Sequence, residues 1–320
     1  MATNTIDNTI QDSKFHLGLT PWDFTQQSAQ KLSDQASFAE SCGYQSFWLP
    51  ENHFGNNALP EPMLLLASVA ANTTTIKLAT TSYLLPLRNP LLAAEQVAVL
   101  DQLSNGRVIL GVGRGYSKET LHAFDIKPST KRQLFEWCLG KMQAAWSGDA
   151  VSLHEDGSSA VNVSPLPVQQ PHPPIWVAAF GPKALAQAGR LGLPYLASPL
   201  ETFEELKVNY AAYDAAIAEA GRTSPADRPI MRSVFLSNDK AKLQSIRQQL
   251  AKTKPPKGLE TAPVIDDWAI IGDSNYVQDY IAEYRETLNA THLIVTRLRL
   301  GDLEDLDFKS SIAQIAEIFA

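Results

Sequence analysis

Short apolar runs alternate with longer amphipathic segments along the chain from residue 15 onward. In the clearest unit, 91–119, the apolar residues of 91–103 share one helical face, and the Ser-Asn-Gly turn at 104–106 ends the helix. The next run, 107–113, is almost continuously apolar, as in a parallel strand that is covered on both faces. We therefore predict a helix, a turn and a strand, with Arg114 where the strand leaves the core.

The same pattern predicts eight strands that are separated by helices. The predicted strands are 15–19, 44–49, 76–84, 107–113, 175–180, 195–198, 230–236 and 292–297. The predicted helices are 28–42, 61–71, 91–103, 131–146, 181–191, 203–220, a segment from about 239, 274–288 and a terminal helix.

This alternation, without an internal linker, favours an α/β fold made of a single (β/α)8 TIM barrel over residues 15–320. A doubly wound open sheet is the alternative, because alternation alone does not show that a sheet closes. The polar segment 1–14 is predicted to be disordered. The segment 148–174 is predicted to be an excursion from the barrel, with a hairpin as one option, and 252–268 a lid-like loop before the last strand.

Composition narrows the class of protein. The chain has 320 residues, of which 44% are hydrophobic and 19% charged, as in a soluble globular protein. Its formal net charge of −7 predicts no general attraction to nucleic acid or to an anionic membrane. We expect Cys42 and Cys138, which lie in helical patterns, to be reduced residues of a cytoplasmic protein. The sequence predicts neither a signal peptide nor a membrane helix.

Several features predict an anion site at the C-terminal ends of the strands, where TIM barrels place their functional residues. Arg114 follows the fourth strand, and Arg132 lies in the first turn of the next long helix, where a cation opposes the helix dipole. Gly181 opens the helix after the fifth strand, and Lys183 adds a positive charge there. Such a set could hold a phosphate. The alternative is surface pairing of the two arginines with Glu119, Asp125 or Glu136.

Asn52 and His53 follow the second strand at the same rim. His53 could act as a base or as a hydrogen-bond donor, whereas Asn52 can only exchange hydrogen bonds. Capping of their own loop is the alternative role for both residues. The remaining histidines show no metal-ligand spacing. The glycines of 111–115 do not complete a dinucleotide-binding motif, because Tyr116 stands where the third glycine or alanine belongs.

The stretch 89–115 reads NPLLAAEQVAVLDQLSNGRVILGVGRG, 47–54 reads FWLPENHF and 80–90 reads TTSYLLPLRNP. In these motifs the chain resembles the bacterial luciferase-like flavin-dependent monooxygenases, in particular the α chain of luciferase. The resemblance implies a (β/α)8 barrel that binds reduced flavin, usually FMN and in some branches a deazaflavin. It also implies a separate flavin reductase, dioxygen as co-substrate, and a flavin C4a-hydroperoxide that oxidises a substrate such as an aldehyde. Pairing of two chains, as a homodimer or with a paralogue, through helices near the second and third strands is usual in that family.

Carried over by position, the resemblance places Arg114 and Arg132 on the flavin-phosphate arginines of the family. Phe180 and Gly181 fall on its strand-five phosphate loop. Thr81-Ser82 falls on a cis peptide bond under the isoalloxazine ring. Gly113 stands where luciferase has a cysteine beside the flavin, and the missing side chain is expected to leave room there.

The main departure is at Asn52, because luciferase reads Glu-His-His-Phe where this chain reads Glu-Asn-His-Phe. The first histidine of that pattern is the catalytic one, and an amide cannot accept a proton at neutral pH. We expect an FMN-dependent monooxygenase that oxidises a small substrate such as an aldehyde or ketone. Asn52 and His53 are expected to face the reactive edge of the flavin. A non-catalytic flavin-binding partner subunit and a deazaflavin-dependent hydride-transfer enzyme are the alternatives.

Overall fold

The computed structural model describes residues 15–23, 29–56, 58–252, 264–298, 300 and 303–319. The segment predicted to be disordered, 1–14, lies outside the described residues, as does most of the predicted lid-like loop, 253–263. Among the helices of the described ranges, none combines the length and the apolar character that a membrane span requires.

Within the described residues, ten strands form one sheet. They are β1 (His16–Leu19), β2 (Ser46–Leu49), β3 (Lys77–Thr80), β4 (Tyr83–Leu84), β5 (Val108–Gly113), β6 (Ile175–Ala178), β7 (Tyr195–Leu196), β8 (Pro229–Leu236), β9 (Ala269–Gly272) and β10 (His292–Thr296). The α-helices are α1 (Ala29–Ser41), α2 (Pro62–Asn72), α3 (Pro90–Leu103), α4 (Lys118–Ala123), α5 (Lys131–Trp146), α6 (Pro182–Leu191), α7 (Phe203–Glu219), α8 (Lys240–Lys252), α9 (Ser274–Leu288) and α10 (Asp305–Ile318). Two short 3-10 helices are η1 (Leu85–Leu87) and η2 (Ile265–Asp267).

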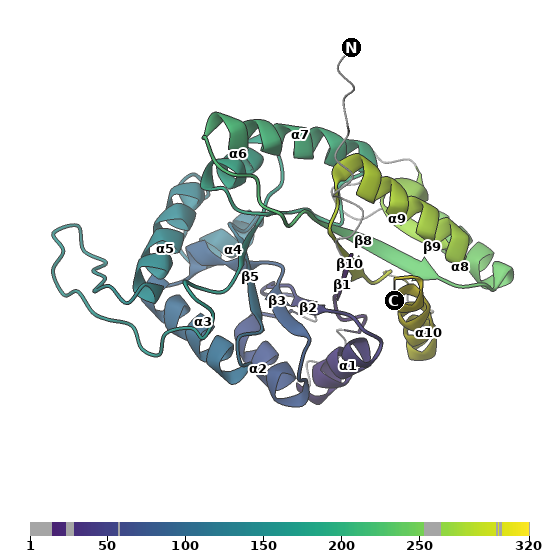
Figure 1. The fold of residues 1–320 in the computed structure, drawn as a ribbon, viewed down its shortest axis with the longest axis horizontal. Coiled ribbons are helices and arrows are strands. Elements are labelled where there is room, and N and C mark those ends of the chain that lie inside the picture. Colours follow the sequence, from purple (N-terminus) through teal and green to yellow (C-terminus); the bar gives the residue numbers. More distant parts are fainter. Residues whose placement is uncertain are drawn as a thin grey trace, which may run out of the picture.

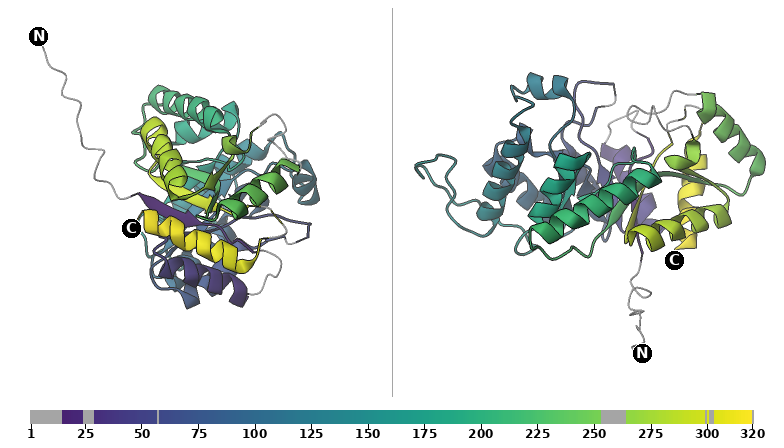
Figure 2. Two further views of the ribbon diagram at one scale, coloured as in Figure 1. Left: turned by 90° about the vertical axis from the view of Figure 1, so that its right-hand side faces the viewer. Right: turned by 90° about the horizontal axis from the view of Figure 1, so that it is seen from above.

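The strands follow barrel order, and every pairing between them is parallel. Hydrogen bonds connect them in the order β7-β6-β5-β3-β2-β1-β10-β8-β9, and β4 pairs with β5. The strands β7 and β8, which would close the ring, contact each other without ladder pairing in the described chain. Helices surround the sheet on its outer side (Figures 1 and 2). The predicted parallel α/β arrangement is therefore confirmed as an incompletely hydrogen-bonded barrel.

The helices begin where the sequence offers caps. Asn89 accepts hydrogen bonds from the amides of Leu91 and Leu92 at the start of α3, and Pro90 occupies the first turn. Thr202 forms a capping box with Glu205 at the start of α7. A second cluster of buried side chains comes from six strands of the sheet: Trp48, Ala79, Trp176, Leu196, Met231 and Ile294.

The structure differs from the prediction in four local details. The predicted strand 76–84 is split into β3 and β4 by a cis peptide bond between Thr81 and Ser82. The strand β9 and the helix α4 were not predicted, because each is too short to show a clear period. The segment 147–174 projects from the body at the left of Figure 1 and contains an isolated antiparallel bridge between Val151 and Val161 in place of a hairpin with two strands.

Candidate functional site

Arg114 is buried at the C-terminal end of β5. Its side chain is 7% exposed, and its guanidinium donates to Gln187 Oε1 at 2.6 Å and to the carbonyl of Ala178 at 2.5 Å. The guanidinium carbon also lies 5.2 Å from the centre of the Phe135 ring. These contacts fix the arginine between β5, β6, α5 and α6 without supplying a carboxylate.

Two further cations stand beside Arg114 at the start of α5. Lys131 donates to the carbonyl of Gly115 at 2.7 Å, and the exposed Arg132 has neither an ion pair nor a side-chain hydrogen bond within the described chain. Burial, with Arg132 as the second cause, lowers the pKa of Arg114 to about 10. Burial and the charges of Arg114 and Arg132 also lower the pKa of Lys131. The three positive charges therefore oppose one another in the protein alone.

The alternative interpretation, pairing of Arg114 and Arg132 with surface acids, is not what the structure shows. Neither arginine forms an ion pair with Glu119, Asp125 or Glu136 in the described residues. Glu136 instead accepts a hydrogen bond from Gln187 at 2.5 Å and forms an ion pair with Arg190. The cation cluster, defined as Arg114, Lys131 and Arg132, thus has no ion-pair partner among the described residues, and the nearby Glu136 carboxylate offsets only part of its charge.

The start of α6 completes this end of the barrel. Gly181, with a φ of 82° that favours glycine, precedes the helix, and no side chain caps its first turn. Lys183 and Arg132 line one open groove of about 910 Å³ between α5, α6 and α7. Phe180 is 62% exposed at the end of the preceding strand. Of the residues predicted after strands four and five, Arg132 and Lys183 therefore share one groove, and Arg114 contacts Ala178 at the end of β6.

The peptide bond between Thr81 and Ser82 is cis, as the resemblance implies. Leu84, in the strand that follows it, pairs with Gly113. The structure corrects the expectation that Gly113 leaves room: an added Cβ would lie 2.0 Å from Ser82 Oγ. The side chain of Ser82 therefore occupies the space beside Gly113, and an added Cβ there would require the Ser82 hydroxyl to move.

Asn52 and His53 lie on the loop after β2 and have different partners. The exposed Asn52 holds its own loop together through two hydrogen bonds to Leu59. Its side-chain Oδ1 accepts from the backbone N–H of Leu59 at 2.5 Å, and its backbone N–H donates to the carbonyl of Leu59. The His53 side chain is 8% exposed, and its Nε2 lies 2.9 Å from Glu51 Oε1. Its ring packs against Phe124 with centres 4.9 Å apart. The loop-capping role is thus observed for Asn52, whereas the orientation of the His53 ring is set by its hydrogen bond to the Glu51 carboxylate.

No role was predicted from the sequence for Glu51 or for Arg88. The Glu51 side chain is fully buried and accepts from His53, from Arg88 at 2.8 Å and from the amide of Leu84 at 3.0 Å. Arg88 also pairs with Glu61 at 2.7 Å and lies over the Tyr83 ring. The partners come from segments far apart in the sequence, and the available signal was the adjacency of Glu51 to His53.

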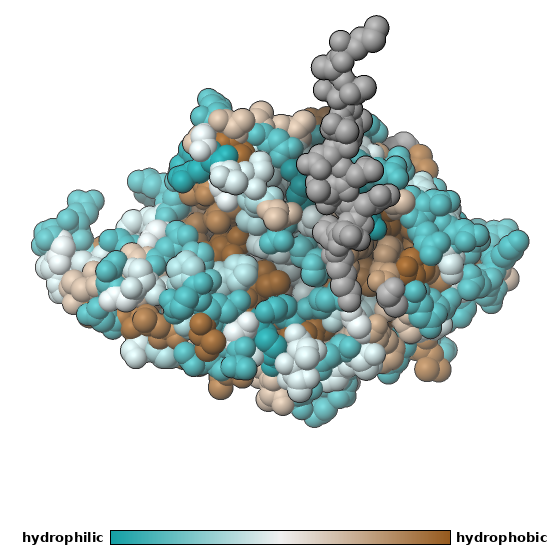
Figure 3. Space-filling model, in the orientation of Figure 1, coloured by the Kyte–Doolittle hydropathy of each residue, from teal (hydrophilic) through white to brown (hydrophobic). Residues whose placement is uncertain are grey.

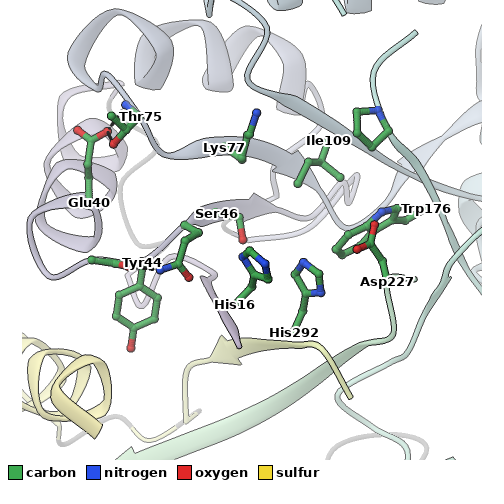
Figure 4. A pocket seen from close by; sticks show the side chains of 13 residues that line it. His16, Glu40, Tyr44, Ser46, Thr75, Lys77, Ile109, Trp176, Asp227 and His292 are labelled. Carbon is green, nitrogen blue, oxygen red and sulfur yellow. Dashed lines mark hydrogen bonds between the residues drawn. The ribbon is translucent and has the colours of Figure 1, made fainter. Parts of the chain in front are cut away.

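A cavity of about 450 Å³ lies at the opposite end of the barrel (Figure 4). Its lining includes the first residues of four strands, His16, Ser46, Lys77 and His292, together with Trp176. The rings of His16 and His292 stack with centres 4.6 Å apart. Residues at the N-terminal ends of barrel strands serve stability in the barrels that have been characterised. We therefore assign the functional site to the other rim.

Comparison with known proteins agrees with this geometry. The family model described as luciferase-like monooxygenase matches residues 15–291. The oxygenase component of a flavin-dependent trigonelline monooxygenase from Acinetobacter baylyi is 30% identical, over 56% of this chain and 52% of that protein. The chain thus spans about half the length of that relative.

Two solved structures share the fold. One is the oxygenating constituent of 3,6-diketocamphane monooxygenase from Pseudomonas putida in complex with FMN, with a TM-score of 0.81, 20% identity, and coverage of 96% of this chain and 98% of that one. The other is the coenzyme F420-dependent tetrahydromethanopterin reductase from Methanopyrus kandleri, with a TM-score of 0.71, 21% identity, and coverage of 95% and 97%.

Proposed function

The chain belongs to the luciferase-like monooxygenase family, and from this membership we propose that it is a monooxygenase that uses reduced FMN and dioxygen to oxidise a small organic substrate, such as an aldehyde or a ketone. The observation that carries the proposal is the cation cluster of Arg114, Lys131 and Arg132, which has no ion-pair partner in the described chain and in which the positive charges lower the pKa values of Arg114 and Lys131. Mutually repelling, partly buried cations beside a helix N-terminus favour a bound dianion such as a terminal phosphate.

The residues present fit a flavin phosphate. Arg114 is held rigidly by Gln187 and Ala178, so little side-chain freedom is lost when an anion binds. Arg132 and Lys183 are exposed and can complete the contact from the groove. Reduced flavin, when bound, supplies the two electrons that activate dioxygen. In this proposal Thr81, Ser82 and Gly113 support the ring, while Asn52 and His53 face its reactive edge.

The contacts of Asn52 favour one alternative. Its Oδ1 is occupied by Leu59, which leaves the Nδ2 group as a hydrogen-bond donor and excludes base catalysis by this side chain. In a non-catalytic, flavin-binding partner subunit, Asn52 would have only this structural role in its loop. Tight flavin binding without oxygen-dependent turnover would support that alternative.

The identity of the flavin is tested by direct competition. The same fold occurs in a structure with FMN and in a coenzyme F420-dependent reductase. We propose FMN because the cluster is compact and suits a short terminal phosphate. A titration of the protein with FMN and with a deazaflavin distinguishes the two, and preferential binding of the deazaflavin would favour hydride transfer over oxygenation.

The decisive experiment follows both binding and oxygen transfer. Protein and reduced FMN are mixed anaerobically and then with isotopically labelled dioxygen, in the presence of decanal or cyclohexanone. We expect a transient absorbance change before the flavin is reoxidised, and label in the oxidised product. If the protein does not bind reduced FMN, or if reoxidation is no different from that of free flavin, the proposal fails.

We also propose a separate flavin reductase as the source of reduced FMN and a dimer as the working form. The matched relative is an oxygenase component, which implies a second component in that system. For the dimer, large apolar side chains are exposed on two neighbouring helices, Leu64 on α2 and Leu92, Val99 and Leu103 on α3. Figure 3 shows hydrophobic surface over this part of the molecule at the lower left. Sedimentation of the protein gives its oligomeric state.

A further inference from the structure

His53 and Glu51 form a directed pair near the proposed reactive edge. The carboxylate of Glu51 can only accept a hydrogen bond, so the 2.9 Å contact with His53 Nε2 requires the proton to be on Nε2. Within the described chain, Nδ1 of His53 has no hydrogen-bond partner. It is also absent from the set of polar atoms that are sealed from solvent without a partner. A neutral His53 therefore presents a proton-free Nδ1.

Glu51 itself has little freedom. Its Oε1 accepts from His53 and Arg88, and its Oε2 accepts from the amide of Leu84. A fully buried carboxylate with both oxygens occupied cannot rotate without breaking several bonds at once. The direction of the imidazole is thus set by the protein before any ligand binds.

We propose that Glu51 is a positioning residue for His53, so that His53 takes the place of the missing histidine at position 52 as the proton acceptor of the site. The inference rests on the proposed function for its catalytic meaning, but not for its geometry. In the step itself a hydroxyl proton of the bound substrate or adduct passes to Nδ1. The oxygen keeps the bonding electron pair, and the imidazolium formed stays paired with Glu51 through Nε2–H.

The test determines which imidazole nitrogen of His53 carries the proton in the flavin-free protein. Nitrogen NMR of isotope-labelled histidine distinguishes a protonated from a bare imidazole nitrogen. In the wild type we expect His53 with the proton on Nε2. In Glu51→Gln, which has the same shape, we expect loss of that preference, because the amide NH2 group can face Nε2 and reverse the tautomer. A wild-type His53 with the proton on Nδ1 would overturn the proposal.

Glu61→Gln is the matched control, since Glu61 pairs with Arg88 but does not touch His53. It should leave the His53 tautomer unchanged, and a change equal to that of Glu51→Gln would show a general effect of cluster charge. Modification of His53 by diethyl pyrocarbonate, followed by peptide mass spectrometry, gives a second measurement. We expect loss of modification in Glu51→Gln, because Nδ1 is then protonated, and modification equal to that of the wild type would contradict the proposal.

A further measurement separates positioning from catalysis. For a substrate that the wild type oxidises, Glu51→Gln should lower kcat by about 100-fold or more, as loss of general base catalysis does, while Kd for reduced FMN stays unchanged. If the NMR result holds but the protein binds no flavin, the proposed function fails and the Glu51–His53 pair stands. If flavin oxygenation occurs with the opposite tautomer, only the present inference fails.

Discussion

Removal of the Arg132 charge should change stability and ligand binding in opposite directions. The guanidinium of Arg132 is exposed, unpaired in the described chain, and close enough to Arg114 to lower its pKa. It also lies in the first turn of α5, where a positive charge opposes the helix dipole. We therefore expect Arg132→Gln to stabilise the flavin-free protein.

The size of the stabilisation can be bounded. The pKa of Arg114 falls from 12.5 to about 10, and a tenfold change in proton affinity corresponds to about 1.4 kcal/mol. The net effect of all causes is therefore about 3.5 kcal/mol. Burial is the larger cause and Arg132 the smaller one, so the gain from Arg132→Gln is about 1 kcal/mol or less, including the dipole contribution.

The same substitution should weaken phosphate binding. A hydrogen bond to a charged group contributes roughly 1.5 to 3 kcal/mol, which corresponds to a loss of affinity of about 10- to 100-fold. Inorganic phosphate and FMN should both be affected, because the lost contact is to the phosphate group.

Thermal unfolding with and without FMN, together with calorimetric titration, measures both effects. In the absence of ligand, Tm of Arg132→Gln should rise by about 2 °C, and saturating FMN should raise it less than in the wild type. Arg222→Gln is the matched control, because Arg222 lies in the same groove without contributing to the pKa of Arg114. A lower Tm in the absence of ligand, or an unchanged Kd for FMN, would refute the assignment of Arg132 to an anion site.

Three further outcomes are expected. Gly113→Ala should destabilise the protein by about 1 to 3 kcal/mol in chemical denaturation, because the new methyl group would overlap Ser82; an unchanged midpoint would contradict the close packing of β4 on β5. Burial, aided by His16, lowers the pKa of His292 from 6.5 to about 3, so the unfolded chain binds this proton first and stability should fall as pH decreases from 6.5 to 3. Denaturation midpoints of wild type and His292→Asn measure this slope, which should be shallower in the variant. Leu92→Asp should shift any dimer toward monomer in sedimentation, since Leu92 is exposed on α3; no shift would place the interface elsewhere.

Long elements with a regular pattern of hydrophobic residues could be predicted from the sequence. The helix 131–146 was predicted with its observed bounds, because a buried face recurs along it and Gly148 follows it. The short strand β9 was missed because four apolar residues beside a polar loop carry no period. Closure could not be predicted either, since the missing ladder between β7 and β8 depends on contacts between distant segments.

The site was predictable only as far as single residues imply their partners. Arg114 and Arg132 could be identified because strand ends and helix starts are visible in the sequence. The absence of an ion pair with Glu136 could not be predicted, because it depends on Gln187 and Arg190 occupying that carboxylate. The role of Gly113 was misjudged for the same reason: whether a missing side chain leaves space depends on Ser82, which the sequence does not place.

The proposed phosphate site and the proposed proton acceptor are joined by one strand pair. Glu51 accepts from the amide of Leu84, Leu84 pairs with Gly113, and Gly113 directly precedes Arg114. This path contains no flexible side chain except that of Glu51, whose two oxygens are both occupied. A substitution that moves β4 away from β5 should therefore disturb the His53 tautomer as well as phosphate affinity. Gly113→Ala is such a substitution, and an altered FMN affinity with an unchanged His53 nitrogen spectrum would show that the two ends are held independently.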